Sequence, residues 1–442
     1  MRRTIVARQG GLPFDTHAMV PDFLLDHRCK SYPLAATPCD ASAIGARGWN
    51  LLADDLPYPL AVIRRSALDH NIAWMQAYAR TKGVALAPHG KTSMSPELFA
   101  LQLAAGAWGL SFATVFQLAV GVEAGVRRAI IANQVVCDAD FDGLAALLDR
   151  HEGLRVWFLV DSTAQLALIE DWAARRGRSR RFDTLLEVGI PGQRTGCRTL
   201  EQTMALARAM AASPAVRLGG IECYEGGVAN CNSEHDAREV TALVRRMTEA
   251  VRACDAERLF AEESVLVTAG GSAVFDLVVP LLRVQGLSRP VQGVLRSGCY
   301  VTHDHGNYRR FLKLVEQREG LHDSLLPALE VWAMVQSVPE PGLALLTCGR
   351  RDISYDLEMP MPVRHAPRGE RGTPRPAPGG WTIGALNDQH AYLRFDPAGP
   401  VPAVGDRVAL GLSHPCTTFD KWRWLALVED DGAVSGAIST RF

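Results

Sequence analysis

Between about residues 58 and 295, short apolar runs alternate with longer segments whose apolar positions recur at helical spacing. Short bounded apolar runs predict buried strands, and apolar residues repeating every three to four positions predict amphipathic helices. Eight strands are predicted in this region: Val84–Ala87, Gly109–Phe112, Ala129–Ala132, Arg155–Val160, Thr184–Val188, Arg217–Cys223, Val265–Thr268 and Gly293–Leu295. The predicted helices between them include Ser95–Ala105, Thr163–Arg175, Thr199–Ala212 and Ser233–Ala253.

This alternation of strands and helices predicts the fold class. Strands separated by helices pair in parallel through crossover connections, and eight of them favour a closed barrel over an open sheet. A further strand at Pro59–Arg64 precedes the set and is expected to pack outside it. The prediction is therefore an α/β protein built on a (β/α)8 TIM-type barrel.

After about residue 321 the pattern changes to short β-like runs with few helical repeats. These runs are Leu329–Ser337, Leu343–Leu346, Ala391–Phe395, Arg407–Leu412 and Trp424–Val428. The stretch 360–380 is dense in Pro, Gly and Arg, which predicts a surface loop. The predicted domains are an N-terminal extension (1–55) that wraps a neighbouring subunit or covers the site, the barrel (56–320), and a β-rich C-terminal domain (321–442).

Composition restricts the class of protein. The 442 residues are 48% hydrophobic and 21% charged with a formal net charge of -1, so we expect a large core and no nucleic-acid partner. No apolar stretch reaches the length of a membrane span, and the N-terminus lacks the apolar core of a signal peptide. The ten cysteines include no Cys-x-x-Cys pair, which favours buried thiols in a reducing cytoplasm.

A lysine follows the first predicted barrel strand, in the segment Ala-Pro-His-Gly-Lys-Thr at 87–92. The C-terminal ends of barrel strands are where active sites of this architecture are built. A lysine desolvated there offers a neutral amine for imine formation. The alternative interpretation of Lys91 is a solvated loop residue.

Two glycine-rich turns follow the last two barrel strands, Thr-Ala-Gly-Gly-Ser at 268–272 and Arg-Ser-Gly-Cys-Tyr at 296–300. Glycines allow backbone amides to approach a phosphate, and the loops after strands seven and eight form the usual phosphate site of such barrels. Either turn alone is also typical of an ordinary tight turn. Their position opposite Lys91 favours a phosphate-bearing ligand.

Two other strand ends carry candidate ligand contacts. Arg194, in the turn 189–196, can pair with an anionic ring oxygen. Tyr224 can face a planar ligand. The alternatives are a structural ion pair for Arg194 and a core position for Tyr224.

With these segments together, the chain resembles the alanine-racemase-like, fold-type III pyridoxal-phosphate enzymes. Within them it is similar to the D-serine dehydratase and D-threonine aldolase group, often named amino acid deaminase. The resemblance rests on Pro-His-Gly-Lys-Thr (88–92), the Arg-Thr-Gly turn (194–196), Tyr224 and the two glycine turns, in order from about residue 55 to the C-terminus.

The resemblance implies a role for each of these residues. Lys91 would form the Schiff base with pyridoxal 5'-phosphate, and Arg194 would contact the ring hydroxyl. The phosphate would be held by Gly270, Gly271, Ser272, Gly298, Cys299 and Tyr300. The chain departs from the pattern at Gly90, where many relatives have Ala, and in the inserted Ile-Pro-Gly-Gln at 190–193.

The C-terminal domain carries a possible metal pair, His414 and Cys416. Residues two apart on an extended segment point to one side and can share one ion. The resemblance supports this, because the D-serine dehydratase group has His-x-Cys as a zinc pair and D-threonine aldolases usually have His-x-Asp. His390 is a possible pocket residue, with a structural histidine as the alternative. The His-Asp-His segment at 303–305 is expected to be polar lining beside the phosphate turn.

The resemblance therefore implies a lyase that uses pyridoxal phosphate and Zn²⁺ or another divalent metal. It would convert a D-3-hydroxy amino acid such as D-serine or D-threonine to a 2-oxo acid and ammonia. A retro-aldol cleavage to glycine and an aldehyde is the nearest alternative. A non-catalytic carrier of the cofactor is the alternative from another class. Relatives also imply a homodimer in which one barrel mouth faces the partner's β-domain.

Overall fold

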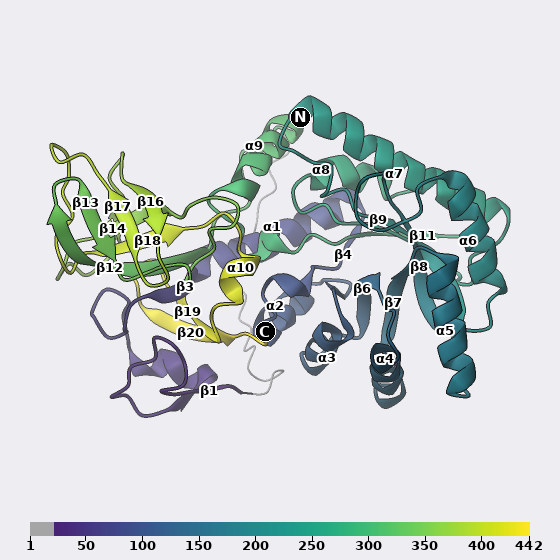
Figure 1. Cartoon of the computed structure of the whole chain (residues 1–442), viewed down its shortest axis with the longest axis horizontal. Helices are drawn as coiled ribbons and strands as arrows, with labels where there is room; N and C mark the ends of the chain where they lie inside the picture. Colours follow the sequence, from purple (N-terminus) through teal and green to yellow (C-terminus); the bar gives the residue numbers. More distant parts are fainter. Residues whose placement is uncertain (1–21) are drawn as a thin grey trace.

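The computed structural model describes residues 22–442, and its larger unit is a barrel of parallel strands surrounded by helices (Figure 1). The strands are β4 (Ala85–Leu86), β5 (Leu110–Phe112), β6 (Arg128–Gln134), β7 (Arg155–Val160), β8 (Phe182–Val188), β9 (Val216–Cys223), β10 (Val265–Ala269) and β11 (Val291–Leu295). They pair in the order β4-β11-β10-β9-β8-β7-β6-β5. The predicted (β/α)8 barrel is confirmed.

The first and last strands of this order, β4 and β5, do not form a regular β-ladder with each other. Backbone hydrogen bonds from residues at and beside these strands close the barrel. The amide of Trp108 donates to the carbonyl of Leu86 (2.8 Å), and the amide of Ser111 donates to that of Pro88 (2.9 Å). Inside, alternate strand residues such as Ile130 and Leu185 form one apolar cluster. The intervening residues face the helices, so each strand is buried on both faces, as parallel strands require.

Short polar residues cap the first turn of several barrel helices. The helices are α1 (Arg65–Lys82), α2 (Pro96–Ala104), α3 (Val115–Glu123), α4 (Asp138–Arg150), α5 (Thr163–Arg175), α6 (Leu200–Ala212), α7 (Ser233–Ala256), α8 (Phe275–Val278) and α9 (Asn307–Glu319). Ser95, Thr114, Ser162 and Thr199 each accept an amide of the first helical turn of α2, α3, α5 and α6. These caps determine where each strand-to-helix loop ends and the helix begins. They therefore help to position the loops that form the rim of the barrel.

The C-terminal unit is a second, mostly antiparallel sheet. Its strands are β12 (Leu329–Glu340), β13 (Leu343–Leu346), β14 (Met361–Ala366), β15 (Arg375–Pro376), β16 (Thr382–Leu386), β17 (Ala391–Arg394), β18 (Arg407–Gly411), β19 (Trp424–Val428) and β20 (Val434–Ser439). The additional strand expected outside the barrel, β3 (Leu60–Arg64), pairs with β12 and β19 of this sheet. The chain therefore passes through the second sheet before it enters the barrel, which ties the two units together.

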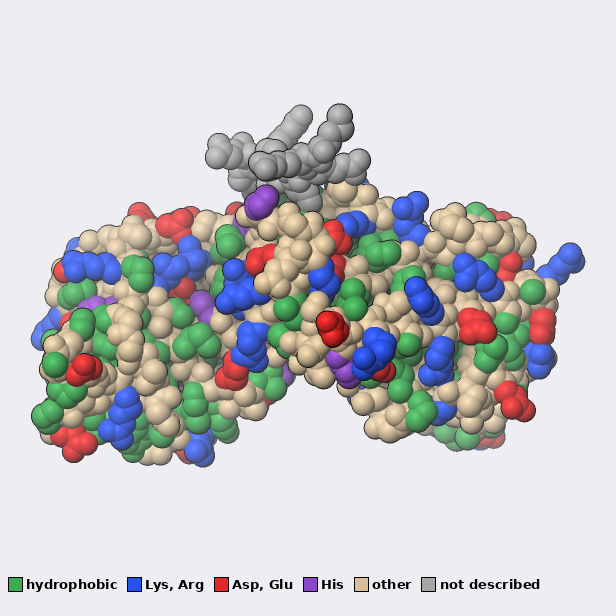
Figure 2. All heavy atoms as spheres, turned by 90° about the horizontal axis from the view of Figure 1, so that it is seen from above, with side chains coloured by type: hydrophobic (Ala, Val, Ile, Leu, Met, Phe, Trp, Pro, Cys, Tyr) green, Lys and Arg blue, Asp and Glu red, His purple; other side chains and the backbone are tan. Residues whose placement is uncertain are grey.

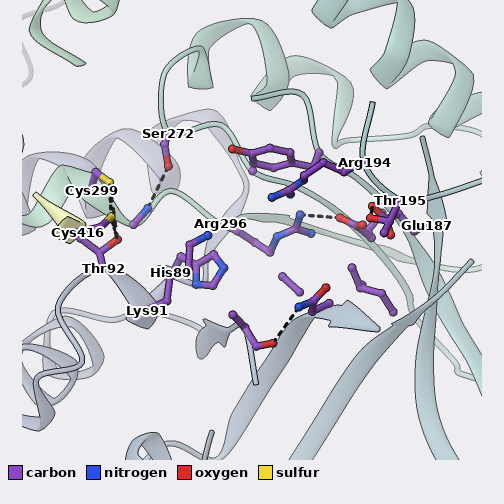
Figure 3. Close-up of a pocket in the computed structure, with 18 of the residues that line it drawn as sticks. His89, Lys91, Thr92, Glu187, Arg194, Thr195, Ser272, Arg296, Cys299 and Cys416 are labelled. Carbon is purple, nitrogen blue, oxygen red and sulfur yellow. Dashed lines mark hydrogen bonds and ion pairs between the residues drawn. The ribbon is translucent and has the colours of Figure 1, made fainter. Parts of the chain in front are cut away.

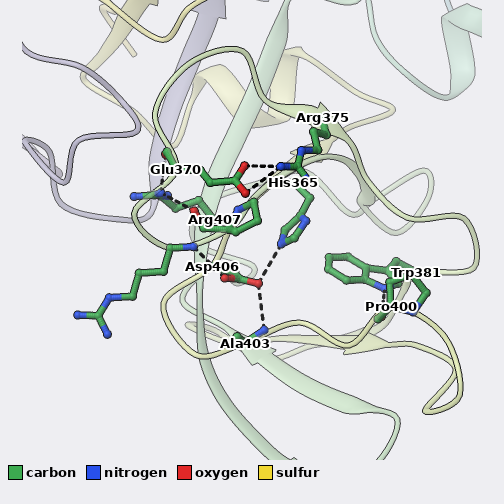
Figure 4. Close-up of polar contacts among 10 residues, drawn as sticks. His365, Glu370, Arg375, Trp381, Pro400, Ala403, Asp406 and Arg407 are labelled. Carbon is green, nitrogen blue, oxygen red and sulfur yellow. Dashed lines mark hydrogen bonds and ion pairs between the residues drawn. The ribbon is translucent and has the colours of Figure 1, made fainter.

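The predicted surface loop at 360–380 is wrong in part, because it contains the six-residue strand β14, which pairs with β18. Arg407 fixes the chain that follows β14. Its buried guanidinium donates hydrogen bonds to the carbonyls of Pro367 (2.8 Å) and Glu370 (3.1 Å) (Figure 4). The adjacent Asp406 accepts the imidazole of His365. Pro and Gly content concealed a strand that is secured by charged partners far along the chain.

Residues 22–58 pack on the C-terminal sheet of their own chain. This segment contains β1 (Leu24–Leu25), β2 (Cys39–Asp40) and the 3-10 helix η2 (Ala41–Arg47). Its apolar side chains share a cluster with β19 and β20. The prediction that the N-terminal extension covers the site or a neighbour falls partly on residues 1–21, which lie outside the described residues.

On the face that Figure 2 shows, positively charged (blue) and negatively charged (red) side chains are mixed, without an extended patch of a single sign. The arginines at and just after the end of α5, Arg175, Arg176 and Arg178, pair with Asp138, Asp142 and Asp149 of α4. All ten cysteines are free and six of them are buried. Within residues 22–442, no helix combines the length and the apolar character that crossing a membrane demands.

Candidate active site

A cavity of about 290 Å³ opens where the barrel strands end and is closed on one side by the turn that precedes the short helix α10 (Cys416–Phe419). Figure 3 shows the side chains from the barrel and from the C-terminal unit converging on it. Nine of the residues singled out in the sequence line this cavity: Lys91, Arg194, Tyr224, Gly270, Ser272, Gly298, Cys299, His414 and Cys416. Residues up to 325 positions apart are thus brought to one site, since Lys91 and Cys416 both face it.

Lys91 lies in a single 3-10 turn, η3 (Gly90–Thr92), directly after β4, and its side chain is exposed at the cavity. It supplies the sole lysine amine among the described lining residues. The glycine before it is required by packing. A Cβ at Gly90 would lie 2.6 Å from the ring of Phe112 and 2.9 Å from that of Phe99. Gly90 therefore allows the turn to sit on these two rings with Lys91 at the cavity.

His89 also lines the cavity, two residues before the lysine. Burial, together with the positive charges of Lys91 and Arg296, holds the pKa of His89 well below its usual value. Its Nδ1 is buried and has no hydrogen-bond partner among the described residues. The site therefore contains a neutral imidazole with a free polar atom, a role that its place in the Pro-His-Gly-Lys motif did not by itself reveal.

A buried ion pair forms the floor of the cavity. Arg296 is 4% exposed and Glu222 fully buried, and their side chains meet at 2.6 Å. Arg296 also donates to the hydroxyl of Thr268 and the carbonyl of Cys223. Burial raises the pKa of Glu222, and its Oε1 has no hydrogen-bond partner within the described chain. An ion pair so buried needs such surrounding donors to be tolerated, and the free oxygen is available to a ligand.

A second buried carboxyl, that of Glu187 at the end of β8, stands beside this pair. Burial, with a smaller contribution from Glu222, raises the pKa of Glu187 to about 7. The hydroxyl of Thr195 (2.7 Å) and the amide of Gln134 donate to it. Neither carboxyl could be singled out in the sequence, because both lie inside apolar runs that predict only strands.

Arg194 and Tyr224 both line the cavity and are in direct contact, with the guanidinium 4.2 Å from the centre of the ring. This is a cation–π contact, so the two side chains orient each other. The long turn that carries Arg194 is closed by Arg198, whose guanidinium donates to the carbonyls of Gln193 (2.9 Å) and Thr195 (2.8 Å). The inserted residues at 190–193 therefore lengthen the turn without removing Arg194 from the cavity.

The two glycine turns lie side by side, and the amide of Gly298 points to the hydroxyl of Ser272 (3.4 Å). A Cβ at Gly298 would lie 2.7 Å from the carbonyl oxygen of His89, so only glycine allows this close approach. The amides of Gly270 and Gly271 point elsewhere, to the carboxylate of Glu225. Gly271 does not line the cavity.

Two other residues from the sequence prediction do not reach the cavity of this chain. Tyr300 is buried, and its hydroxyl accepts the amide of Gln102 (3.1 Å). His390 lies in the turn between β16 and β17, where its carbonyl accepts the amide of Asn387. Neither side chain is among the described residues that line the cavity.

The His-Asp-His segment at 303–305 does not line the cavity either, so the expectation of polar lining is wrong. Asp304 accepts the amides of Gly306, Tyr308 and Arg309 and thereby caps α9. Capping is the ordinary use of an Asp at a helix start. Its consequence is that Tyr308, not identified from the sequence, reaches the cavity from the first turn of α9.

His414 and Cys416 bring the C-terminal unit into the cavity. The thiol of Cys416 is 3.8 Å from that of Cys299 and 3.5 Å from the hydroxyl of Thr92. The hydrogen bond from Cys299, with those from His414 and Thr92, holds the pKa of Cys416 well below its usual value. The hydrogen bond to Cys416 and the carboxylate of Asp356 raise the pKa of His414 to about 9. The two shifts share one cause, because the His414 and Cys416 side chains stabilise each other's charged form.

These two side chains have the donor chemistry of a zinc site, a thiolate and an imidazole. Asp356 engages Nδ1 of His414, which leaves Nε2 for a metal and matches the carboxylate–histidine arrangement common around bound metals. Across residues 22–442 no group of three or more His, Cys, Asp or Glu side chains is arranged to hold an ion. The residues thus fit a metal held by two protein ligands, with further positions open to water or substrate.

The barrel side of the cavity fits a planar, phosphate-bearing aldehyde. Lys91 offers the amine, Arg194 a cation for a ring oxygen, and the turn at 296–300 a close-packed glycine beside Ser272. The unpartnered polar atoms of His89 and Glu222 would also be satisfied by a polar ligand.

Comparison with known proteins identifies both units. Residues 63–280 match the family model "Alanine racemase, N-terminal domain", and residues 328–428 match the model "Putative serine dehydratase domain". The first match covers most of the barrel strands, and the second covers the C-terminal sheet up to the end of β19.

Three relatives extend the likeness over most of the chain. A D-threonine aldolase from Arthrobacter sp is 27% identical over 84% of this chain and 89% of its own. A D-threo-3-hydroxyaspartate dehydratase from Delftia sp. (strain HT23) is 26% identical over 86% of this chain and 96% of its own. The crystal structure of a D-threonine aldolase from Filomicrobium marinum superposes with a TM-score of 0.70 and 25% identity, covering 89% of this chain and 97% of that one.

Proposed function

The chain belongs to the alanine-racemase-like, fold-type III pyridoxal-phosphate enzymes and is a lyase of that group, and from this premise we propose its reaction. It eliminates water from a D-3-hydroxy amino acid of the D-serine or D-threonine type, and hydrolysis of the resulting 2-amino-2-enoic acid takes up one water and releases a 2-oxo acid and ammonia. A divalent metal, zinc or a similar ion, assists. The observation that carries the proposal is that His414 and Cys416 line the same cavity as Lys91.

Lys91 is the residue that would hold the cofactor and move the proton. Pyridoxal phosphate, when bound, supplies the electron sink that makes a proton at Cα acidic. Nζ of Lys91, which would hold the cofactor before substrate binds, would then be the base that takes that proton. Arg194, fixed by Tyr224, is in a position to contact the ring oxygen and orient the cofactor.

His414 and Cys416 would hold the metal, with Asp356 fixing the imidazole. A divalent ion there supplies a Lewis acid for the β-hydroxyl. Because the described residues offer two protein ligands, a metal held there would have positions open to the substrate hydroxyl. The same cavity then serves proton removal at Cα and departure of the group at Cβ, which are the two events of a dehydration.

Aldol cleavage is the second candidate, because the relatives named above include D-threonine aldolases as well as a dehydratase. The feature that favours dehydration is Cys416, since the aldolases of this group usually have Asp there. Product analysis separates the two reactions. A 2-oxo acid with ammonia supports dehydration, whereas glycine with an aldehyde would overturn it. The third alternative, a carrier without catalysis, is set aside because the relatives are lyases.

The choice of substrate is tested with three D-amino acids that present a β-hydroxyl: D-serine, D-threonine and D-threo-3-hydroxyaspartate. Each is assayed beside its L-form. Turnover of the D-forms alone supports the proposed stereochemistry. Equal turnover of L-forms, or turnover of amino acids without a β-hydroxyl, would contradict the proposal that the metal pair acts on that group.

We further propose that the enzyme is a homodimer whose barrel mouth faces the partner's β-domain. Support comes from large apolar side chains that are exposed around this mouth. Tyr355, Leu357 and Met359 flank Asp356, while Phe116 and Val136 follow the ends of β5 and β6. Sedimentation of the holoenzyme is the test: a fully active monomer would contradict the proposal.

A further inference from the structure

Glu225 is a buried carboxylate that neither the sequence motifs nor the cavity lining single out. It follows β9 by two residues and is 1% exposed. Its two oxygens accept the amides of Gly270 (3.1 Å) and Gly271, the two glycines of the first glycine turn. One acidic side chain therefore engages both backbone donors of a turn that was expected to bind phosphate with them.

The carboxylate lies behind the turn and not in the cavity. Gly270 and Ser272 line the cavity, but Glu225 and Gly271 do not. Side chains could not replace either glycine: a Cβ at Gly271 would lie 2.4 Å from Leu295, and one at Gly270 would lie 2.9 Å from Tyr224. The turn is thus pressed between the barrel and Glu225, with its amides directed away from the ligand space.

This orientation determines which groups remain for a phosphate. The hydroxyl of Ser272 faces the amide of Gly298, so these two turns meet at the cavity edge. Two hydrogen bonds to one buried side chain restrain two successive amides of the turn. Glu225 can therefore hold the turn in the form that presents Ser272.

We propose that Glu225 is a positioning residue for the cofactor phosphate, acting through the Gly270–Gly271 turn to fix Ser272 against the second glycine turn. The inference rests on pyridoxal phosphate as the cofactor. It also changes the expected phosphate contacts. The amides of Gly270 and Gly271 donate to Glu225, so the phosphate is bound by the part of the site that Ser272 and Gly298 form.

The test is the binding of pyridoxal phosphate and of pyridoxal, which lacks the phosphate, to purified cofactor-free enzyme. Glu225→Gln keeps the shape but turns the NH2 donor of its carboxamide toward one glycine amide, so one of the two hydrogen bonds is lost. We expect the dissociation constant of pyridoxal phosphate to rise about tenfold. That of pyridoxal should stay within about twofold, because it does not use the phosphate site.

The matched control is Glu97→Gln. Glu97 is equally buried (3% exposed) and accepts the hydroxyls of Ser95 and Ser439, but it is not among the described lining residues. This variant should bind both ligands as the wild type does. Circular dichroism checks that each variant is folded. If Glu225→Gln does not fold, Glu225→Asp, which keeps the charge and shortens the reach, is measured with the same two ligands.

Each outcome decides the matter. Equal weakening of both ligands would mean that Glu225 only stabilises the fold, and unchanged binding of both would mean that the turn does not need it. Tighter binding of pyridoxal phosphate would show that Glu225 competes with the phosphate. Wild-type enzyme that binds neither ligand would contradict the cofactor itself, a result distinguishable from failure of the Glu225 role.

Discussion

The two walls of the cavity are built in different ways. The barrel wall, formed by the strand ends with Arg296 and Glu222, is buried: those side chains are 3% and 0% exposed and have several partners. The C-terminal wall, formed by His414 and Cys416, is held by one turn, and its outer carboxylate Asp356 is 43% exposed against 26% for His414. Burial fixes the first wall, whereas the second depends on a few polar contacts near solvent.

The difference indicates that cofactor binding and metal-assisted chemistry are separable. Changes in the barrel wall should remove the cofactor or the fold with it. Changes in the C-terminal wall should stop turnover while the cofactor remains bound. Loss of Lys91 and of Cys416 tests that separation, whereas substitutions at Glu187 and Gly90 test how the barrel wall is built.

Loss of the lysine should have the largest effect. Lys91→Ala removes both the amine that attaches the cofactor and the base that takes the proton, so turnover should fall by roughly 10³-fold or more. The near-visible absorption of the attached cofactor should disappear, as measured by spectroscopy of the purified variant. A Lys91→Ala protein that borohydride still links covalently to the cofactor would contradict the assignment of Lys91.

Loss of the Cys416 thiol should affect the C-terminal wall of the cavity and leave cofactor binding by the barrel wall intact. Cys416→Ala removes one of two metal ligands, so turnover should fall by roughly 100-fold with the cofactor absorption unchanged. Metal content, measured by atomic emission, should fall with it. Cys137→Ala, at an exposed cysteine outside the cavity, is the control and should keep both. Loss of the cofactor from Cys416→Ala would show that the walls are not separable.

The buried carboxyl of Glu187 should make the stability of the cofactor-free protein depend on pH. Its folded-state pKa of about 7 is above the ordinary value of 4.5, so the folded state binds the proton more tightly. The contribution is fully present below about pH 4.5 and is lost as pH rises through about 7, at most about 3 kcal/mol. Denaturant unfolding at several pH values should show this decline in the wild type and a smaller decline in Glu187→Gln. Identical slopes would contradict the raised pKa of Glu187.

Adding a side chain at Gly90 should have the smallest effect of these changes, a moderate loss of stability. Gly90→Ala forces a Cβ against Phe112 and Phe99, which should lower the free energy of unfolding by about 1–3 kcal/mol. Gly143→Ala, in the interior of α4 with its nearest contact at 3.4 Å, should instead raise it by about 0.5–1 kcal/mol. Chemical denaturation measures both. A stable Gly90→Ala protein would show that the two rings can move.

The sequence predicted the eight barrel strands because each is a short apolar run bounded by a helix, a pattern that burial on both faces imposes. It missed β14, since pairing with β18 and the support of Arg407 depend on residues about 40 positions away. In the site, Lys91, His414 and Cys416 were predicted from motifs. Glu187 and Glu222 were missed because a carboxyl inside a strand gains its role only when the barrel closes.

Asp356, Tyr308 and Glu225 were missed for a related reason. Asp356 and Glu225 act on the site through partners distant in sequence, His414 for Asp356 and the first glycine turn for Glu225. Tyr308 faces the cavity because Asp304 caps α9 at that point. Pattern identifies the residues of a motif, whereas the residues that position them are defined by tertiary contacts.

Chelation of the wild-type holoenzyme tests the central claim most directly. Turnover of a D-3-hydroxy amino acid, cofactor absorption and circular dichroism are measured on one sample before and after removal of metal. We predict that turnover is lost, that the cofactor band and the fold persist, and that zinc or a similar divalent ion restores activity. Full turnover without metal would contradict the account, because His414 and Cys416 would then be mere neighbours. Unfolding on chelation would contradict it equally, because the pair would then be structural.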